Sequence, residues 1–269
     1  DKAAKIKYVH EIVKIDYTRQ ETIANALRNI DRLFLRILPT IEMVDNSSQF
    51  VQEAKKNGVK FIVKLSAMGA DLKPGYTSGR LHRQVEKIIK ESEIPYVFLR
   101  PNSAMQNFIT RTSQTIKNQR TINLPSGDAG ISFVDARDIA AVSAEILTKN
   151  GSQYADNVFD ITGSEALSHS QVAEILSKQT GKNITYMNTS EENTRNEMKK
   201  MGIKNWFIDN ALELYNIYRS GYRSQITSVV EQLTKHKPTT FSQLVKNYAQ
   251  NGLSWPNQLS TFTGWLRFE

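Results

Sequence analysis

The chain has 269 residues and a formal net charge of +8, from 35 Lys and Arg against 27 Asp and Glu. It contains no cysteine, which excludes disulfides, thiolate metal sites and cysteine nucleophiles. No stretch approaches the about 20 apolar residues of a membrane span, and the N-terminus lacks the apolar core of a signal peptide. We therefore expect a cytoplasmic protein with no membrane partner.

The basic residues are spread along the chain in short pairs such as Lys55-Lys56 and Lys199-Lys200. This arrangement is typical of solvated helix faces. No basic run alternates with aromatic residues, so we expect no nucleic-acid partner. A small-molecule substrate is expected, and a homodimer or a partner protein is left open.

Apolar β-rich runs alternate with helical patterns through the first hundred residues. In order, we expect a strand at 11–16, a helix around 20–28, a strand at 32–38 ended by Pro39, a helix from about 42 to 57 closed by Gly58, a strand at 60–66, a helix with Leu81, Val85, Ile88 and Ile89 on one face, and a strand at 94–99. Strands separated by helices of this length indicate βαβ units and a mainly parallel sheet with both faces covered.

The second half is richer in helical patterns. We expect a helix at about 136–149, a strand at 157–161, a helix opened by the capping box Ser168 to Gln171 and closed at Gly181, a strand at 183–187, and three amphipathic helices marked by Ile208, Leu212 and Tyr215, by Ile226, Val229, Val230 and Leu233, and by Phe241, Leu244, Val245 and Tyr248. The predicted fold class is α/β, a Rossmann-like doubly wound parallel sheet with a smaller, mostly helical C-terminal lobe.

A series of strings in a fixed order carries a family resemblance. The series is Asp16-Tyr17, then LSAMGA at 65–70, HRQVE at 82–86, IPYVFLRPN at 94–102, FVDARDIAA at 133–141, DITG at 160–163 and ALSHSQVAEIL at 166–176. Over about residues 1–250 this series resembles the NmrA-like branch of atypical short-chain dehydrogenase/reductases. That resemblance implies a Rossmann-type NAD(P)-binding domain at 1–150 and a substrate or partner lobe at 151–269.

The glycine-rich turn of such a domain is not in the sequence. Neither G-x-x-G-x-x-G nor G-x-G-x-x-G occurs, and Gly127 and Gly130 form an isolated pair. These glycines let the backbone approach the cofactor pyrophosphate at a helix N-terminus. On the resemblance, Asp16 ends the third strand of the domain, and the chain starts at Asp1 rather than Met. We therefore expect the sequence to be incomplete at its start, and we expect open sheet edges and an exposed apolar face where the first strands would pair.

Ligands of open α/β sheets bind outside the carboxyl ends of the strands. The resemblance assigns Asp16 to the adenine, Pro39 and Thr40 to the ribose and nicotinamide side, and Ser66 to the neighbourhood of the substrate carbonyl. Each residue has a structural alternative: Asp16 and Ser66 as caps, and Pro39 as the end of a strand.

His82 is the candidate proton donor. The spacing from His82 to Glu86 resembles that from the catalytic lysine to a glutamate in the family, which puts Ser78 where the catalytic tyrosine stands. Tyr76 and Arg80 imitate the Tyr-x-x-x-Lys pair but lie two residues out of register. A histidine with a pKa near 6.5 suits proton donation, and a structural histidine is the alternative.

Pro101, Asn102 and Phe108 follow the fourth run, where the family closes over the nicotinamide. Phe108 is alternatively a core residue. Asp135 and Asp138 are interpreted as acids at a helix N-terminus, which stabilise the helix dipole.

The sequence thus predicts an NAD(P)H-dependent oxidoreductase that passes hydride to a quinone-like or other small electron-poor acceptor, with His82 and Ser66 as catalytic residues and no metal site. The resemblance implies NAD(P) as cofactor, and NADP is the form we expect. The residue that normally separates the two follows the second strand of such a domain, which this sequence does not contain. The alternative is a non-catalytic NAD(P)-sensing regulatory protein.

Overall fold

The computed structural model describes residues 10–110, 113–149 and 151–250. The chain divides into two compact units, each built from segments far apart in the sequence. Of the described residues, the first unit draws on 10–71, 78–100, 146–149 and 151–159, and the second on 72–77, 101–110, 113–145 and 160–250. The division expected between residues 150 and 151 falls within the last segment of the first unit.

A parallel sheet organises the first unit. Its strands, in spatial order, are β1 (Arg32–Leu35), β2 (Phe61–Leu65), β3 (Tyr96–Pro101) and β5 (Asn157–Ile161). Arg32 lies opposite Phe61, and Ile62 lies opposite Tyr96, both in parallel register. The predicted α/β class with a parallel sheet is confirmed.

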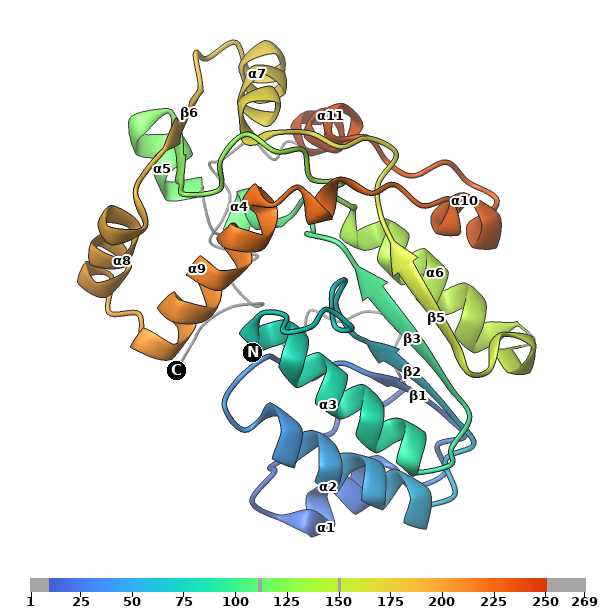
Figure 1. Ribbon diagram of the computed structural model, residues 1–269. Helices are drawn as coiled ribbons and strands as arrows, with labels where there is room; N and C mark the ends of the chain where they lie inside the picture. The colour runs from blue at the N-terminus through green and yellow to red at the C-terminus, as the bar shows by residue number, and fades with distance from the viewer. Residues whose placement is uncertain (1–9, 111–112, 150, 251–269) are drawn as a thin grey trace. The chain divides into compact units, whose positions relative to one another are not determined.

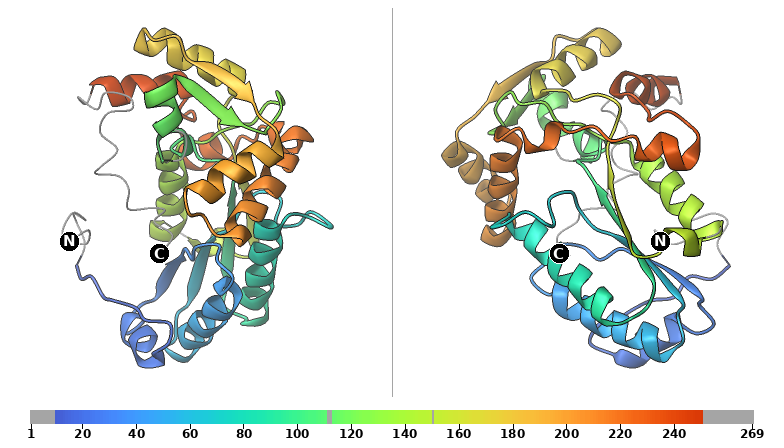
Figure 2. Two further views of the ribbon diagram at one scale, coloured as in Figure 1. Left: turned by 90° about the vertical axis from the view of Figure 1, so that its left-hand side faces the viewer. Right: turned by 45° about the vertical axis from the view of Figure 1, so that its right-hand side comes forward.

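Three helices pack with these strands around one apolar core. They are α1 (Gln20–Ala26), α2 (Met43–Lys56) and α3 (Thr77–Glu91). Figures 1 and 2 show α2 and α3 running beside the strands. Phe50 of α2 and Val85 and Ile89 of α3 join Ile62 and Phe98 of the sheet in this core. The apolar stripe expected on α3 thus faces the sheet.

The prediction of a strand at 11–16 is wrong. Residues 11–16 form no strand, and Ile12 and Val13 are about half exposed. A strand exists only through hydrogen bonds to a neighbour, and no described strand pairs with this segment. The next strand is also shorter than expected, because β1 ends at Leu35. Exposed apolar side chains follow it at Leu38 and Ile41.

The second unit contains most of the helices. Its elements are α4 (Asn107–Thr110), α5 (Ser113–Gln119), β4 (Thr121–Leu124), most of α6 (Ala136–Thr148), α7 (His169–Thr180), β6 (Thr185–Asn188), α8 (Glu191–Lys200), α9 (Asn205–Arg219), the 3-10 helix Tyr222–Ser224, α10 (Val229–Thr234) and α11 (Phe241–Gln250). A further 3-10 helix, Gly151–Tyr154, lies in the first unit. Among the described residues, no helix is both long and apolar enough to cross a membrane.

Local signals explain the best-predicted elements of the second unit. The Ser168 hydroxyl accepts from the Gln171 N–H, and the Gln171 side chain accepts from the Ser168 N–H, so α7 begins at a capping box as expected. Gly181 ends α7 with φ +67°, which glycine adopts without strain. The sequence did not predict β4, which pairs in parallel with β6, or α8. Nor did it place the start of α10, which leaves Ile226 outside the helix.

Candidate functional site

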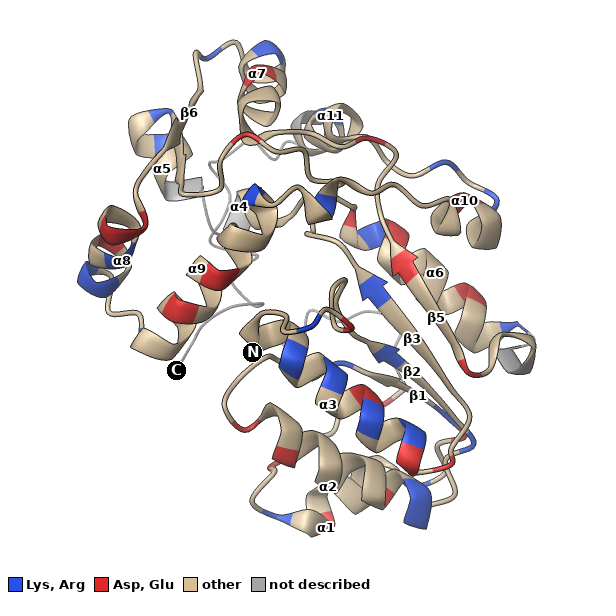
Figure 3. Cartoon of the chain, viewed as in Figure 1, with Lys and Arg blue, Asp and Glu red and all other residues tan. Residues whose placement is uncertain are grey.

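A cluster of polar side chains is buried in the first unit. Lys64 and Ser66 come from β2 and the residue after it, Arg100 comes from β3, and His82 and Glu86 come from α3. Figure 3 shows the basic residues that interrupt β2 and β3. His82 and Glu86 are one helical turn apart and therefore share the face of α3 that is buried. We call these five residues the buried polar cluster.

Glu86 holds part of the cluster together. The Ser66 hydroxyl donates to Glu86 Oε1 at 2.6 Å, and Arg100 donates from Nε and Nη2 to the two carboxylate oxygens at 3.0 and 2.7 Å. Arg100 also reaches the more exposed Asp71 at 2.9 Å. This two-pronged contact compensates the buried charges. Because the hydroxyl has one hydrogen, Ser66 directs it at Glu86.

Lys64 faces His82 from the sheet. Its side chain is fully buried, and Nζ donates to the carbonyl of Leu65 and lies 3.5 Å from His82 Nδ1. Burial lowers the pKa of Lys64 to about 7. While Lys64 carries its proton, Nδ1 of His82 accepts from it, so the neutral imidazole has its hydrogen on Nε2. The cluster therefore contains an amine with a pKa of about 7 beside a histidine, and the tautomer of the histidine follows the charge of that amine.

The structure brings together two of the five residues predicted in this unit. Ser66 and His82 join the buried polar cluster. Asp16 instead accepts from the side chain and backbone of Thr18, at 2.6 and 2.9 Å, which lowers the pKa of its carboxyl. Pro39 and Thr40 follow β1 and are half-buried, and Thr40 N–H donates to the carbonyl of Leu38 at 2.9 Å. The ligand roles of all five stay predictions.

The remaining predicted residues belong to the second unit. Pro101 ends β3, and the buried Asn102 follows it. Asn102 Nδ2 donates to Ser132 Oγ at 2.7 Å and to the carbonyl of Arg223 at 2.8 Å. Phe108 lies in an apolar core, with its ring edge-on to Phe133 and Phe241. Phe108 therefore has the contacts of a core residue, and its cofactor role stays a prediction.

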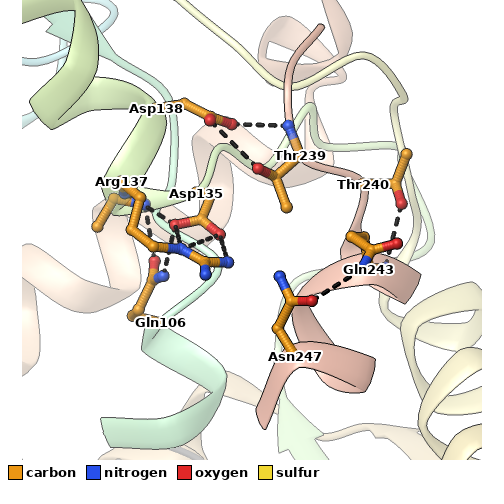
Figure 4. A network of polar contacts seen from close by, with 9 residues as sticks. Gln106, Asp135, Arg137, Asp138, Thr239, Thr240, Gln243 and Asn247 are labelled. Atoms are coloured by element: carbon orange, nitrogen blue, oxygen red, sulfur yellow. Dashed lines mark hydrogen bonds and ion pairs between the residues drawn. The ribbon is translucent and has the colours of Figure 1, made fainter. Parts of the chain in front are cut away.

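Asp135 and Asp138 anchor the start of α6 (Figure 4). Asp135 accepts from the N–H of Arg137 at 2.8 Å and forms an ion pair with its guanidinium. Asp138 accepts from the N–H and hydroxyl of Thr239 at 2.8 and 3.2 Å. The interpretation as helix N-terminal acids is confirmed, and Asp138 also ties the segment before α11 to α6.

Sequence reasoning did not single out Lys64, Arg100 or Arg223. Lys64 and Arg100 each stand inside an otherwise apolar strand, and this was a usable signal, because a charge in a buried strand must find a partner. Arg223 contacts Asn102 from 121 residues away, and nothing in the local sequence marks it.

The model of the NmrA-like family matches residues 5–250. An NAD(P)H azoreductase of Xenophilus azovorans is 29% identical over 235 residues, which cover 87% of this chain and 81% of that protein. Festuclavine synthase II of Penicillium roqueforti is 31% identical over 225 residues, covering 83% and 76%. The crystal structure of an NADPH-dependent quinone oxidoreductase of Escherichia coli aligns with a TM-score of 0.76 and 25% identity, covering 87% and 82% of the chains. The present chain has a Rossmann-like fold. It belongs to the NmrA-like family.

Proposed function

We propose that this protein is an NAD(P)H-dependent oxidoreductase that reduces a quinone-like or other small electron-poor acceptor. Membership of the NmrA-like family carries the proposal, together with relatives named for NAD(P)H-dependent azo and quinone reduction. We further propose that it acts in the cytoplasm on a small molecule, and that the segment to residue 150 forms the dinucleotide-binding part. A homodimer or a partner protein stays a prediction.

The described residues suit two parts of a dinucleotide. When bound, NAD(P)H supplies a hydride from its nicotinamide ring. The Asp16 carboxylate keeps acceptor capacity beyond its bonds from Thr18, which suits an adenine amino group. Thr40 is partly exposed beyond the carboxyl end of β1, where open α/β sheets bind ligands. For the pyrophosphate the sequence holds no glycine-rich turn.

His82 is the residue that we propose for proton transfer. Reduction of a carbonyl or a quinone leaves a negatively charged oxygen that takes a proton. When Lys64 carries its proton, its ammonium at Nδ1 leaves the imidazole hydrogen on Nε2, and we propose Nε2 as the atom that donates it. Glu86, one turn along α3, is fixed by hydrogen bonds from Ser66 and Arg100. We therefore propose that Ser66 acts through Glu86 and that His82 contacts the acceptor.

Oxidation of NAD(P)H by a quinone tests the proposal. The full chain is expected to accelerate the loss of NAD(P)H absorbance, and His82→Gln to slow it about 100-fold, the usual contribution of one general acid. His236→Gln, on the exposed His236, is the matched control and should keep the rate. A wild-type rate equal to that in buffer would refute the enzyme. Binding of NAD(P) without turnover would instead favour the regulatory alternative.

A further inference from the structure

Arg223 is a buried cation whose described polar contacts are all with neutral groups. It lies in the 3-10 helix Tyr222–Ser224 of the second unit, and 3% of its surface is exposed. Nη2 donates to the hydroxyl of Tyr76 at 2.7 Å, and Nη1 donates to Asn102 Oδ1 at 3.3 Å. Its Nε–H is buried and meets no acceptor in the described part of the chain.

This environment leaves a positive charge uncompensated. A guanidinium has five N–H donors, and taking it out of water is costly unless an anion or a full set of acceptors replaces the water. Burial raises the pKa of Tyr76, so its phenol stays neutral and cannot act as the counter-ion. Arg100, the comparable arginine of the first unit, meets the carboxylates of Glu86 and Asp71. Within the described ranges, no negatively charged group forms an ion pair with Arg223.

The segments that cover Arg223 lie at the surface. The Tyr76 ring lies over the guanidinium with its centroid 5.5 Å from Cζ, and the same segment carries the exposed Lys73 and Pro74. On the other side, the exposed Ser224 and Gln225 follow Arg223 directly. Surface segments of this kind open at lower free energy than a packed core. Access of a ligand to the guanidinium requires local displacement of Tyr76, which is itself buried.

We propose that Arg223, held in place by Asn102 and covered by Tyr76, binds a carboxylate or sulfonate group carried by the electron acceptor. The proposal rests on the proposed function, and it names the acceptor as anionic. Two oxygens of the ligand take Nε–H and Nη2–H, the paired geometry that arginine offers to oxyanions, and the Tyr76 hydroxyl gives up its place on Nη2. Asn102 follows the carboxyl end of β3, where ligands of such sheets bind. We assign the anion to the acceptor, and competition with NADP⁺ tests this assignment against the cofactor phosphates.

Three probes with one ring system test the assignment without turnover. Anthraquinone-2-sulfonate, anthraquinone-2-carboxylate and 2-(hydroxymethyl)anthraquinone are titrated into the full chain without cofactor, and binding is followed by tryptophan fluorescence. At least one anionic probe is expected to bind about tenfold or more tighter than the neutral one, as for a hydrogen bond to a charged group. The preferred anion distinguishes a planar from a tetrahedral ligand. Equal affinities for all three probes would overturn the proposal.

Variants locate the effect. Arg223→Met removes the charge and keeps the bulk, and should abolish the preference for the anion, whereas Arg223→Lys should retain part of it. Arg195→Met is the matched control, because Arg195 is a partly exposed arginine paired with Asp209. If Arg195→Met loses the preference to the same extent, the effect is general charge and the site is refuted. If Arg223→Met fails to fold, the probe affinities of Arg223→Lys and of the wild type still test the proposal.

Two further measurements distinguish an acceptor site from a cofactor-phosphate site, and the acceptor site from the proposed function. Displacement of the anionic probe by NADP⁺ in the wild type, lost in Arg223→Lys, would assign the site to the cofactor phosphates and overturn the proposal. Quinone turnover, measured separately, tests the proposed function. An anion preference without turnover would leave the site standing and the enzyme refuted. Turnover that is indifferent to the acceptor's charge and to Arg223 would do the reverse.

Discussion

Glu86 and Arg100 form an ion pair in the first unit, and their side chains are only 5% and 11% exposed. Breaking a buried pair leaves one charge without its partner, which costs about 3 kcal/mol or more. We predict that Glu86→Gln lowers the free energy of unfolding by about that amount. Asp71→Asn removes the other, 61% exposed carboxylate on Arg100 and should cost less than about 1 kcal/mol. Urea unfolding measures both variants, and similar losses would contradict the central place given to Glu86.

The partners of Lys64 and Arg223 could not be predicted, because they are distant in the sequence. The family resemblance singled out Ser66, at the end of a strand, and His82, by its spacing to Glu86. Lys64 lies 18 residues from His82, and Arg223 lies 147 residues from Tyr76. No spacing rule joins positions so far apart, because their proximity is a product of the packed fold. The polar partners of a site are therefore the part of it that the sequence specifies least directly.

Two helices offer a test of how local capping contributes to stability. Ser168 caps α7, which buries Val172 and Leu176, and Ser190 caps α8, which buries none of its residues. Loss of an N-cap hydroxyl typically costs about 1 kcal/mol. We predict that Ser168→Ala lowers the free energy of global unfolding by about 1 kcal/mol. Ser190→Ala should instead increase amide hydrogen exchange within α8 and leave global unfolding nearly unchanged, because that helix can fray alone. Equal global losses would show that α8 unfolds with the core.

The same contrast explains which elements the sequence predicted. Strand 157–161 was placed to the residue, and α7 was placed from its capping box and the glycine that ends it. The helix α8 has no buried residues and so no apolar stripe to reveal it. Residues 11–16 have the composition of a strand and form none, since pairing depends on a neighbour rather than on the residues themselves. Elements defined by their own caps and stripes are predictable, and those defined by partners are not.

For the molecule as a whole, His169 makes the stability of the fold depend on pH, because it lies in the core of the second unit. Its ring is 2% exposed, stacks on Tyr186 and meets Phe133 edge-on, and its Nδ1 lies 2.9 Å from Ser126 Oγ. Burial lowers the pKa of His169 to about 4 from the usual 6.5. Between these two values the unfolded chain binds a proton that the folded chain does not, so stability falls as the pH falls through this window.

We therefore predict that the free energy of unfolding drops by about 2 kcal/mol between pH 7 and pH 5 on account of His169 alone. Urea titrations at pH 7, 6 and 5 measure the drop, and His169→Gln should remove it while lowering stability at every pH. His236→Gln is the control: His236 is exposed, so the drop should persist in that variant. An unchanged pH dependence in His169→Gln would mean that the acid sensitivity of the fold arises elsewhere, with the buried carboxylates as the next groups to test, because their protonation also lowers stability as the pH falls.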